Sequence, residues 1–178
     1  MPNLINKILI ENIYTNIVKT SRNKNFFLAF KVDDTVEGRF DIIILHSFIV
    51  FQFFLYIGQK KSDLSQMLFD HMFADFDNNL REMGFGDIAV NKRMKQFIKA
   101  FYGRIYNYSK SQTQFEKMND DTMLKNTILR NIYKDKDPGN ESINFWKNYI
   151  VDNIKYINDN TLDKNIINLF SFKSIEKW

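Results

Sequence analysis

Apolar residues follow a helical spacing along this chain, and few prolines or glycines interrupt it. The 178 residues contain only two Pro and six Gly, which favours long, rarely interrupted elements. Apolar residues recur at intervals of three and four along most of the sequence, and no long stretch alternates as a half-buried strand does. The sequence therefore predicts an all-α fold, a single-domain bundle of about six to seven helices.

The expected helices follow this periodicity and end at turn-forming residues. We predict helices over residues 3–22, 38–57, 62–83, 87–110, 113–136 and 143–157, and a short one around 161–170. Residues 23–38 break the pattern and are predicted to connect two helices. Gly58 is the expected stop of the second helix, and Ser62 and Asp63 are candidate caps of the third. The whole chain, 1–178, is expected to form one domain; any boundary within it would fall near Ser111 or Pro138.

Composition excludes several chemistries. There is no Cys, which rules out disulfides, thiolate catalysis and zinc–thiolate sites. The two His, His46 and His71, are not part of the Glu-x-x-His pairs that a di-metal bundle uses, and no Ser-His-Asp set can be assembled. The net charge of +4 is modest for a nucleic-acid-binding protein. We therefore expect no enzyme activity, no metal, no cofactor and no DNA binding.

The segment DIIILHSFIVFQFFLYI, residues 41–57, is apolar on nearly every side. It is short for a membrane span, which needs about 20 apolar residues, and His46, Ser47 and Gln52 interrupt it. A central core helix is the favoured interpretation; a helix with one loosely covered, client-binding side is the alternative. Asp41 is placed in its first turn, where the helix dipole favours an acid. His46 is interpreted as a hydrogen-bonded core residue rather than a ligand.

Residues 62–110 are predicted to form two helices of opposite charge joined at a glycine corner. Between 62 and 90 there are six acidic residues and one basic residue, and between 91 and 110 six basic residues and no acid. Gly84 and Gly86 are expected to permit the turn, and Asp87 to cap the second helix. The predicted core face of the first helix consists of Leu68, Phe69, Met72, Phe73, Phe76, Leu80 and Met83.

The charged residues of these two helices have two interpretations. Asp70 and Asp77 form an acidic stripe, which Arg81 joins at an i, i+4 spacing that suits an exposed ion pair. A basic stripe on the second helix consists of Lys92, Lys95 and Lys99. These lysines form either a solvated face or a contact for RNA, anionic lipid or an acidic protein.

Two arginines of the second helix are interpreted differently from the lysines. Arg93 and Arg104 lie at the edge of the core face, where an arginine needs a carboxylate partner. Asp75 and Glu82 are the expected partners.

Three segments together resemble one known family. They are DDTVEGRFDIIILH, FDHMFADFDNNLREMGFGDIAVNKRMK and AFYGRIYNY, and they lie in this order in the chain. Their motifs, GRFD…LH and D-x-x-LREMG-x-GD…KRMK…FYGR, are long and specific. The chain thereby resembles the ubiquinol–cytochrome c chaperone family, as a bacterial-type member. The resemblance covers about residues 14–110, with residues 111–178 as a helical extension.

The resemblance implies a function. Mitochondrial members of this family look after newly made cytochrome b near the ribosomal tunnel exit, in early assembly of the bc1 complex, together with a small partner protein, and they are not enzymes. This chain is expected to act in the cytoplasm, since it has no Cys, with a peripheral contact of its basic stripe to the inner face of the cytoplasmic membrane as an open alternative. The alternative is a helical RNA- or ribosome-binding module that uses the basic stripe. The candidate partner-binding residues are Arg39, His46, Asp70, Asp77, Arg81, Asp87, Lys92, Arg93, Lys95, Lys99 and Arg104.

Overall fold

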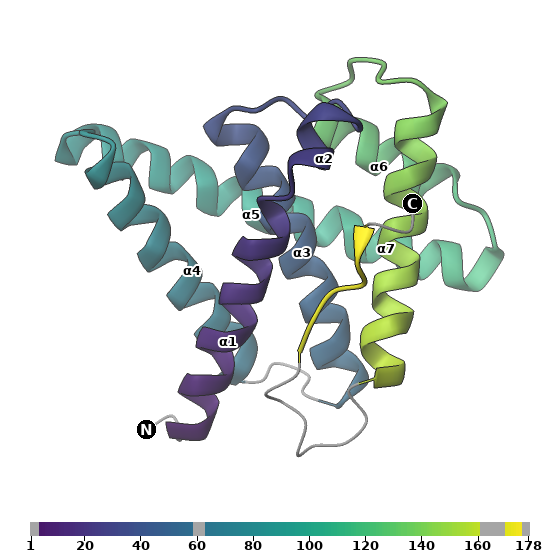
Figure 1. The fold of residues 1–178 in the computed structure, drawn as a ribbon, viewed down its shortest axis with the longest axis horizontal. Helices are drawn as coiled ribbons and strands as arrows, with labels where there is room; N and C mark the ends of the chain where they lie inside the picture. The colour runs from purple at the N-terminus through teal and green to yellow at the C-terminus, as the bar shows by residue number, and fades with distance from the viewer. Residues whose placement is uncertain (1–3, 59–62, 161–169, 176–178) are drawn as a thin grey trace.

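The structure is a computed structural model that describes residues 4–58, 63–160 and 170–175. These residues contain helices and no strand, which confirms the predicted all-α class (Figure 1). The helices are α1 (Leu4–Ser21), α2 (Lys24–Leu28), α3 (Val36–Tyr56), α4 (Asp63–Glu82), α5 (Asp87–Met118), α6 (Thr122–Tyr133) and α7 (Asn140–Asn160).

Helix α3 is the centre of the bundle. It packs against α1, α4, α5, α6 and α7, and residues from Ile42 to Val50 are almost all fully buried. Within the described ranges, α3 is the one helix long and apolar enough to span a membrane by length and composition, and 72% of its most apolar window is buried inside the protein. The prediction of a central core helix is therefore correct, because other helices rather than lipid cover its apolar surface.

The chain between α1 and α3 differs from the prediction. The expected connection contains the short helix α2, whose N-cap Asn23 accepts a hydrogen bond from Asn25 N. Thr35 caps α3 in the same way, with its hydroxyl accepting from Gly38 N at 3.0 Å. Because this cap starts α3 at Val36, Asp41 lies in the second turn instead of the first, and its side chain is buried. The predicted placement of Asp41 at the helix dipole was wrong.

The longest helix, α5, continues through the predicted break near 111. Ser111 and Gln112 are buried, and Ser111 Oγ lies 2.6 Å from Asn107 O and 2.7 Å from Thr127 Oγ1 of α6. Ser111 thus has a partner inside the bundle, and Gln112 Nε2 donates to Glu116 one turn further along α5 at 3.0 Å, so neither residue ends the helix. The helix ends instead at Asn119, which adopts the left-handed conformation with φ of 53°.

The C-terminal residues complete the core. Helix α7 covers Asn140–Asn160 and so begins three residues before, and ends three residues after, the predicted helix over 143–157. The expected helix at 161–170 lies outside the described residues except for Phe170. Phe172 packs its ring edge-on against His46, and Lys173 N donates to Asn153 Oδ1 of α7 at 2.8 Å. Residues 170–175 thus lie against α3 and α7.

The corner between α4 and α5 is a Schellman motif. Phe85 N donates to Leu80 O at 3.1 Å, and Gly84 N donates to Arg81 O at 2.9 Å. Gly84 has a φ of +86°, which a glycine adopts without strain, whereas Gly86 has an ordinary φ of −72°. Only Gly84 therefore needs to be glycine for this turn. Gly58, with φ of +79°, ends α3 as predicted, and the proposed cap Ser62 lies outside the described residues.

Candidate functional site

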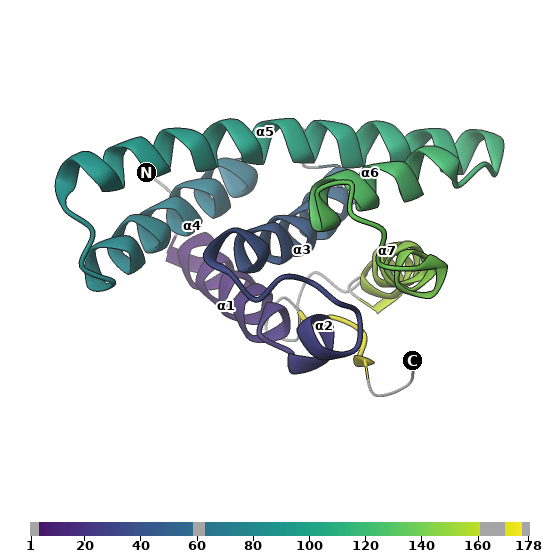
Figure 2. The same ribbon diagram turned by 90° about the horizontal axis from the view of Figure 1, so that it is seen from above.

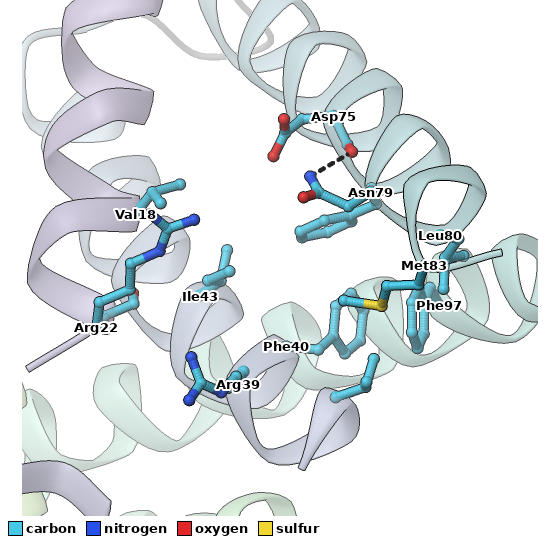
Figure 3. Close-up of a pocket in the computed structure, with 13 residues that line it drawn as sticks. Val18, Arg22, Arg39, Phe40, Ile43, Asp75, Asn79, Leu80, Met83 and Phe97 are labelled. Carbon is cyan, nitrogen blue, oxygen red and sulfur yellow. Dashed lines mark hydrogen bonds between the residues drawn. The ribbon is translucent and has the colours of Figure 1, made fainter. Parts of the chain in front are cut away.

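The bundle has an open groove where α1 and α4 diverge over the beginning of α3. Figure 1 shows the two helices separating towards Ser21 and Glu82, and Figure 3 shows side chains of both pointing into the space between them. We call this space the groove. Its lining residues come from four helices: Val18, Ser21, Arg22, Val36, Arg39, Phe40, Ile43, Asp75, Phe76, Asn79, Leu80, Met83 and Phe97.

The floor of the groove is an aromatic cluster that tertiary packing holds in place. The Phe40 ring stacks on Phe97 of α5 with 4.2 Å between centroids and meets Phe76 of α4 edge-on at 5.3 Å. Phe40 is thus fixed by rings from two other helices, and the floor is both apolar and rigid. Met83 lies at the mouth with 60% of its surface exposed. Met83 was predicted to be a core residue, but it lies one position beyond the last residue of α4, where helical periodicity no longer determines which side a residue faces.

The volume of the groove limits what it can hold. It measures about 180 Å³, well below the roughly 300–1,000 Å³ of pockets that enclose small molecules. A space of this size, open to solvent, suits one or two large apolar side chains of a longer partner segment. The flexible thioether of Met83 at the mouth is adaptable to different side chains.

The rim of the groove is polar and carries both signs of charge. Arg39 pairs with Asp34 at 2.6 Å, and Arg22 makes no ion pair within the described part of the chain. Across the groove, Asp75 accepts a hydrogen bond from Tyr14 Oη at 2.7 Å. Burial, followed by this bond to a carboxylate, raises the pKa of Tyr14, so the hydroxyl stays a donor that anchors Asp75.

A buried ion cluster fixes α3, one side of the groove, to α5 and α6. Asp41 is 1% exposed; its Oδ1 lies 2.6 Å from Arg104 Nη2 of α5, and its Oδ2 contacts Lys134 Nζ at the end of α6. Burial raises the pKa of Asp41 above its usual value, against the opposing effect of the two cations. Arg104 was expected to pair with Asp75 or Glu82, and this was wrong, because the crossing of α3 over α5 brings Asp41 to it instead.

The GRFD motif, which contains Asp41, also makes a close backbone contact next to this cluster. A Cβ atom on Gly38 would lie 1.9 Å from the carbonyl oxygen of Asp33. The segment GRFD, residues 38–41, therefore combines a glycine required by packing, a rim arginine, the aromatic floor and the buried carboxylate. Each residue of this motif has a structural reason to be at its position.

The charged residues predicted at the corner form ion pairs that connect α4 to α5. Arg81 Nε binds Asp77 at 2.6 Å, as expected from the i, i+4 spacing, and its Nη1 contacts Asp87 across the corner. Asp87 was expected to cap α5, but Gly86 occupies the N-cap position and no side-chain cap bond forms. Asp87 is instead the first residue of α5 and pairs with Arg81, so the charges brace the corner. Asp70 lies apart from this group, exposed, and accepts a bond from Gln66 at 2.7 Å.

Arg93 links the corner to α3. Its Nη1 lies 3.0 Å from Glu37 Oε1, and its guanidinium lies 4.6 Å from the centroid of the Phe85 ring. Neither Asp75 nor Glu82, the partners expected for Arg93, makes this contact. Arg93 therefore connects the first turns of α5 to the beginning of α3 and to the Phe85 ring of the corner.

His46 does not face a partner at the surface. It is fully buried, with Nδ1 2.8 Å from Ile42 O and Nε2 2.8 Å from Tyr149 Oη. Since a carbonyl only accepts, Nδ1 donates to Ile42 O, and the neutral ring accepts from Tyr149 through Nε2. Burial lowers the pKa of His46 to about 4. The interpretation of His46 as a hydrogen-bonded core residue is correct.

The basic stripe lies on the other side of α5 from the groove. Lys92, Lys95 and Lys99 are all exposed, and none makes an ion pair with another residue that the structure describes. In the described ranges, no group of three or more His, Asp and Glu side chains is arranged to hold a metal.

Sequence reasoning missed several residues that shape the site. Arg22, Tyr14 and Asn79 belong to the groove or its support, and Lys134 completes the buried cluster. The groove residues lie on amphipathic helices whose polar positions look ordinary in the sequence. Lys134 is 93 positions from Asp41, and no local spacing indicates that pairing.

Two sequence comparisons match this chain to known proteins. A profile of the family described as Ubiquinol-cytochrome C chaperone matches residues 28–168. The ubiquinol-cytochrome c reductase complex assembly factor 1 of Mus musculus is 22% identical over 151 residues, which are 85% of this chain and 50% of that protein. The chain thus spans about half the length of this curated relative.

A solved structure extends the similarity to the fold. The crystal structure of the Cbp3 homolog from Brucella abortus superposes with a TM-score of 0.76 and 27% sequence identity, covering 97% of this chain and 92% of that one. The family match covers well over half of the chain, from the end of α2 past the end of α7. With its all-helical bundle and its GRFD and FYGR motifs joined through Asp41 and Arg104, this chain belongs to the ubiquinol-cytochrome C chaperone family.

Proposed function

We propose that this protein is a non-enzymatic assembly factor that binds newly made cytochrome b and promotes assembly of the ubiquinol–cytochrome c reductase (bc1) complex. Membership of the chaperone family supports the general role. The groove is the observation that supports binding of newly made cytochrome b, because it offers an apolar, rigid floor with an open mouth and a polar rim.

The groove suits transient binding of an apolar segment. Burying one large apolar side chain contributes about 1.5–3 kcal/mol, and a groove of about 180 Å³ takes one or two such side chains. That energy retains a segment of an unassembled membrane protein yet permits its release when the segment finds its place in the complex. The proposal requires no bond-making chemistry of the protein.

We place this activity in the cytoplasm, with a small partner protein and the ribosome as further proposed contacts. The alternative function, an RNA- or ribosome-binding module, is supported by the exposure of Lys92, Lys95 and Lys99. The two functions differ in what they require of the groove. A client-holding protein loses function when the groove mouth is changed, and an RNA-binding module loses it when the lysines are changed.

The test is deletion of the gene followed by complementation, with assembled, haem-loaded bc1 complex as the readout. Wild-type protein is expected to restore the complex, and Met83→Glu, which puts a charge at the groove mouth, is expected to restore it poorly. Met118→Glu is the matched control, because Met118 is 71% exposed and lies at the end of α5. Normal bc1 levels and normal quinol oxidation in the deletion strain would refute the proposed function.

A further inference from the structure

The outer side of α5 forms a continuous exposed stripe. At 100° per residue, seven residues between 88 and 110 fall within an arc of roughly 80°, opposite the buried Val90, Phe97 and Tyr108. Figure 2 shows α5 as a straight helix along one side of the molecule, with the other helices on its inner side. We call this stripe the lysine–tyrosine face; it consists of Ile88, Lys92, Lys95, Lys99, Tyr102, Tyr106 and Lys110.

The charge of this face is uncompensated. No acid occurs from residue 88 to residue 115 of α5. The two arginines of the same stretch turn inward, Arg93 to Glu37 and Arg104 to Asp41. The four lysines of the face make no ion pair or hydrogen bond with any residue in the described ranges. The helix thus separates its bases into paired inner arginines and unpaired outer lysines.

The face also exposes apolar and aromatic groups. Ile88 is 88% exposed, Tyr102 57% and Tyr106 66%. Tyrosine rings are enriched where a membrane meets water, and lysines near an anionic bilayer gain electrostatic attraction to its headgroups. We propose that the lysine–tyrosine face binds the surface of a bilayer that contains anionic phospholipid, with α5 lying parallel to the membrane plane.

The shape of α5 fits an extended planar surface. Lys92 and Lys110 are separated by roughly 27 Å at 1.5 Å per residue, so a flat bilayer meets all four lysines at once, through several headgroups. The deep, narrow groove of an RNA helix does not admit an α-helix, and RNA recognition relies on the forked guanidinium of arginine. Here the arginines point inward, and Ile88 has no counterpart in a polyanion contact. These features favour the bilayer over a nucleic acid.

This inference does not depend on the proposed function, because Phe97, which lines the groove, and the lysine–tyrosine face lie on opposite sides of α5. The experiment is co-sedimentation of the full chain with vesicles of phosphatidylcholine, with or without a third of phosphatidylglycerol. The test variant is Lys92→Glu/Lys95→Glu/Lys99→Glu. The control is Lys7→Glu/Lys19→Glu/Lys155→Glu, exposed lysines of α1 and α7. Either triple changes the net charge by −6, from +4 to −2.

The expected result is binding that requires phosphatidylglycerol and weakens with salt. The α5 triple should bind on the order of 100-fold more weakly, as loss of three surface lysines predicts, and the control triple should retain most of the affinity. Ile88→Gln, which leaves the charge unchanged, should weaken vesicle binding several-fold. Equal loss in both triples, or no preference for phosphatidylglycerol, would overturn the proposal. Tight binding of structured RNA without vesicle binding would also overturn it and identify the face as an RNA contact.

Discussion

The buried cluster of Asp41, Arg104 and Lys134 gives the sharpest test of the fold. Replacing Arg104 with alanine leaves a carboxylate that is 1% exposed with one remaining cation, Lys134, whose side chain is 42% exposed. Removal of one partner of a buried ion pair costs about 3–5 kcal/mol. Because Lys134 remains and Arg104 is itself 18% exposed, we expect a cost below this range, about 2–3 kcal/mol.

The assay is urea and thermal unfolding followed by circular dichroism. For a chain of this length, each kcal/mol lowers Tm by about 2–4 °C, so Arg104→Ala should lower Tm by roughly 4–12 °C. Lys99→Ala is the matched control on the outer side of the same helix, and its free energy of unfolding should change by less than about 0.5 kcal/mol. Equal melting temperatures for the two variants would refute the role given to the Asp41–Arg104 pair.

The loss of stability in Arg104→Ala should also depend on pH in a defined direction. Burial raises the pKa of Asp41, and loss of Arg104 raises it further. A carboxyl group with a raised folded-state pKa stabilises the fold below its unfolded pKa, near 3.8, and this contribution is lost as pH rises through the folded pKa. The cost of Arg104→Ala should therefore be smaller at mildly acidic pH, where Asp41 becomes protonated in the variant, than at pH 7. A cost that does not vary with pH would mean that packing, and not the uncompensated charge, dominates.

Two other residues give independent tests. Gly38→Ala should destabilise the fold by about 1–3 kcal/mol because its Cβ would lie 1.9 Å from Asp33 O. Gly103→Ala, with open space around the new Cβ, should instead stabilise α5 by about 0.5–1 kcal/mol. The denaturant midpoints of the two variants measure the difference, and a lower midpoint for Gly103→Ala than for Gly38→Ala would contradict the packing described for the GRFD motif. Burial lowers the pKa of His46 to about 4. Its neutral ring therefore contributes fully to the free energy of unfolding above the unfolded pKa of 6.5, and about 3 kcal/mol of that free energy is lost as pH falls from 6.5 towards 4. Unfolding free energies of the wild type and His46→Gln across this range measure it, and parallel pH profiles would show that His46 makes no such contribution.

Local signals predicted most of the helices because those signals act within a few residues. The uniform apolarity of residues 41–57 identified the core helix, and Gly84 after an amphipathic stretch identified the corner. Arg81 and Asp77 pair as their spacing predicts. Where the prediction of a break near Ser111 failed, tertiary contact was the cause, since Thr127 of α6 provides the partner that lets a polar residue stay inside a long helix.

The groove was harder to predict from the sequence, for a different reason. A helical wheel shows which side chains turn inward, but it does not show whether the space they face is filled. The groove exists because α1 and α4 diverge over Phe40, and that divergence is set by how α1, α3, α4 and α5 pack against one another. The partner of Arg104 was misassigned for the same reason, since the choice between Asp41 and Asp75 depends on how helices cross.

Photo-crosslinking in cells from the mouth of the groove identifies what the groove binds. A photoreactive amino acid replaces Met83, and, in a parallel strain, Met118, which is also exposed and lies outside the groove. The proposed function predicts that position 83 captures cytochrome b while the bc1 complex is being assembled, and that position 118 captures much less. Capture of cytochrome b at both positions alike, or at neither, would contradict the claim that the groove holds the client.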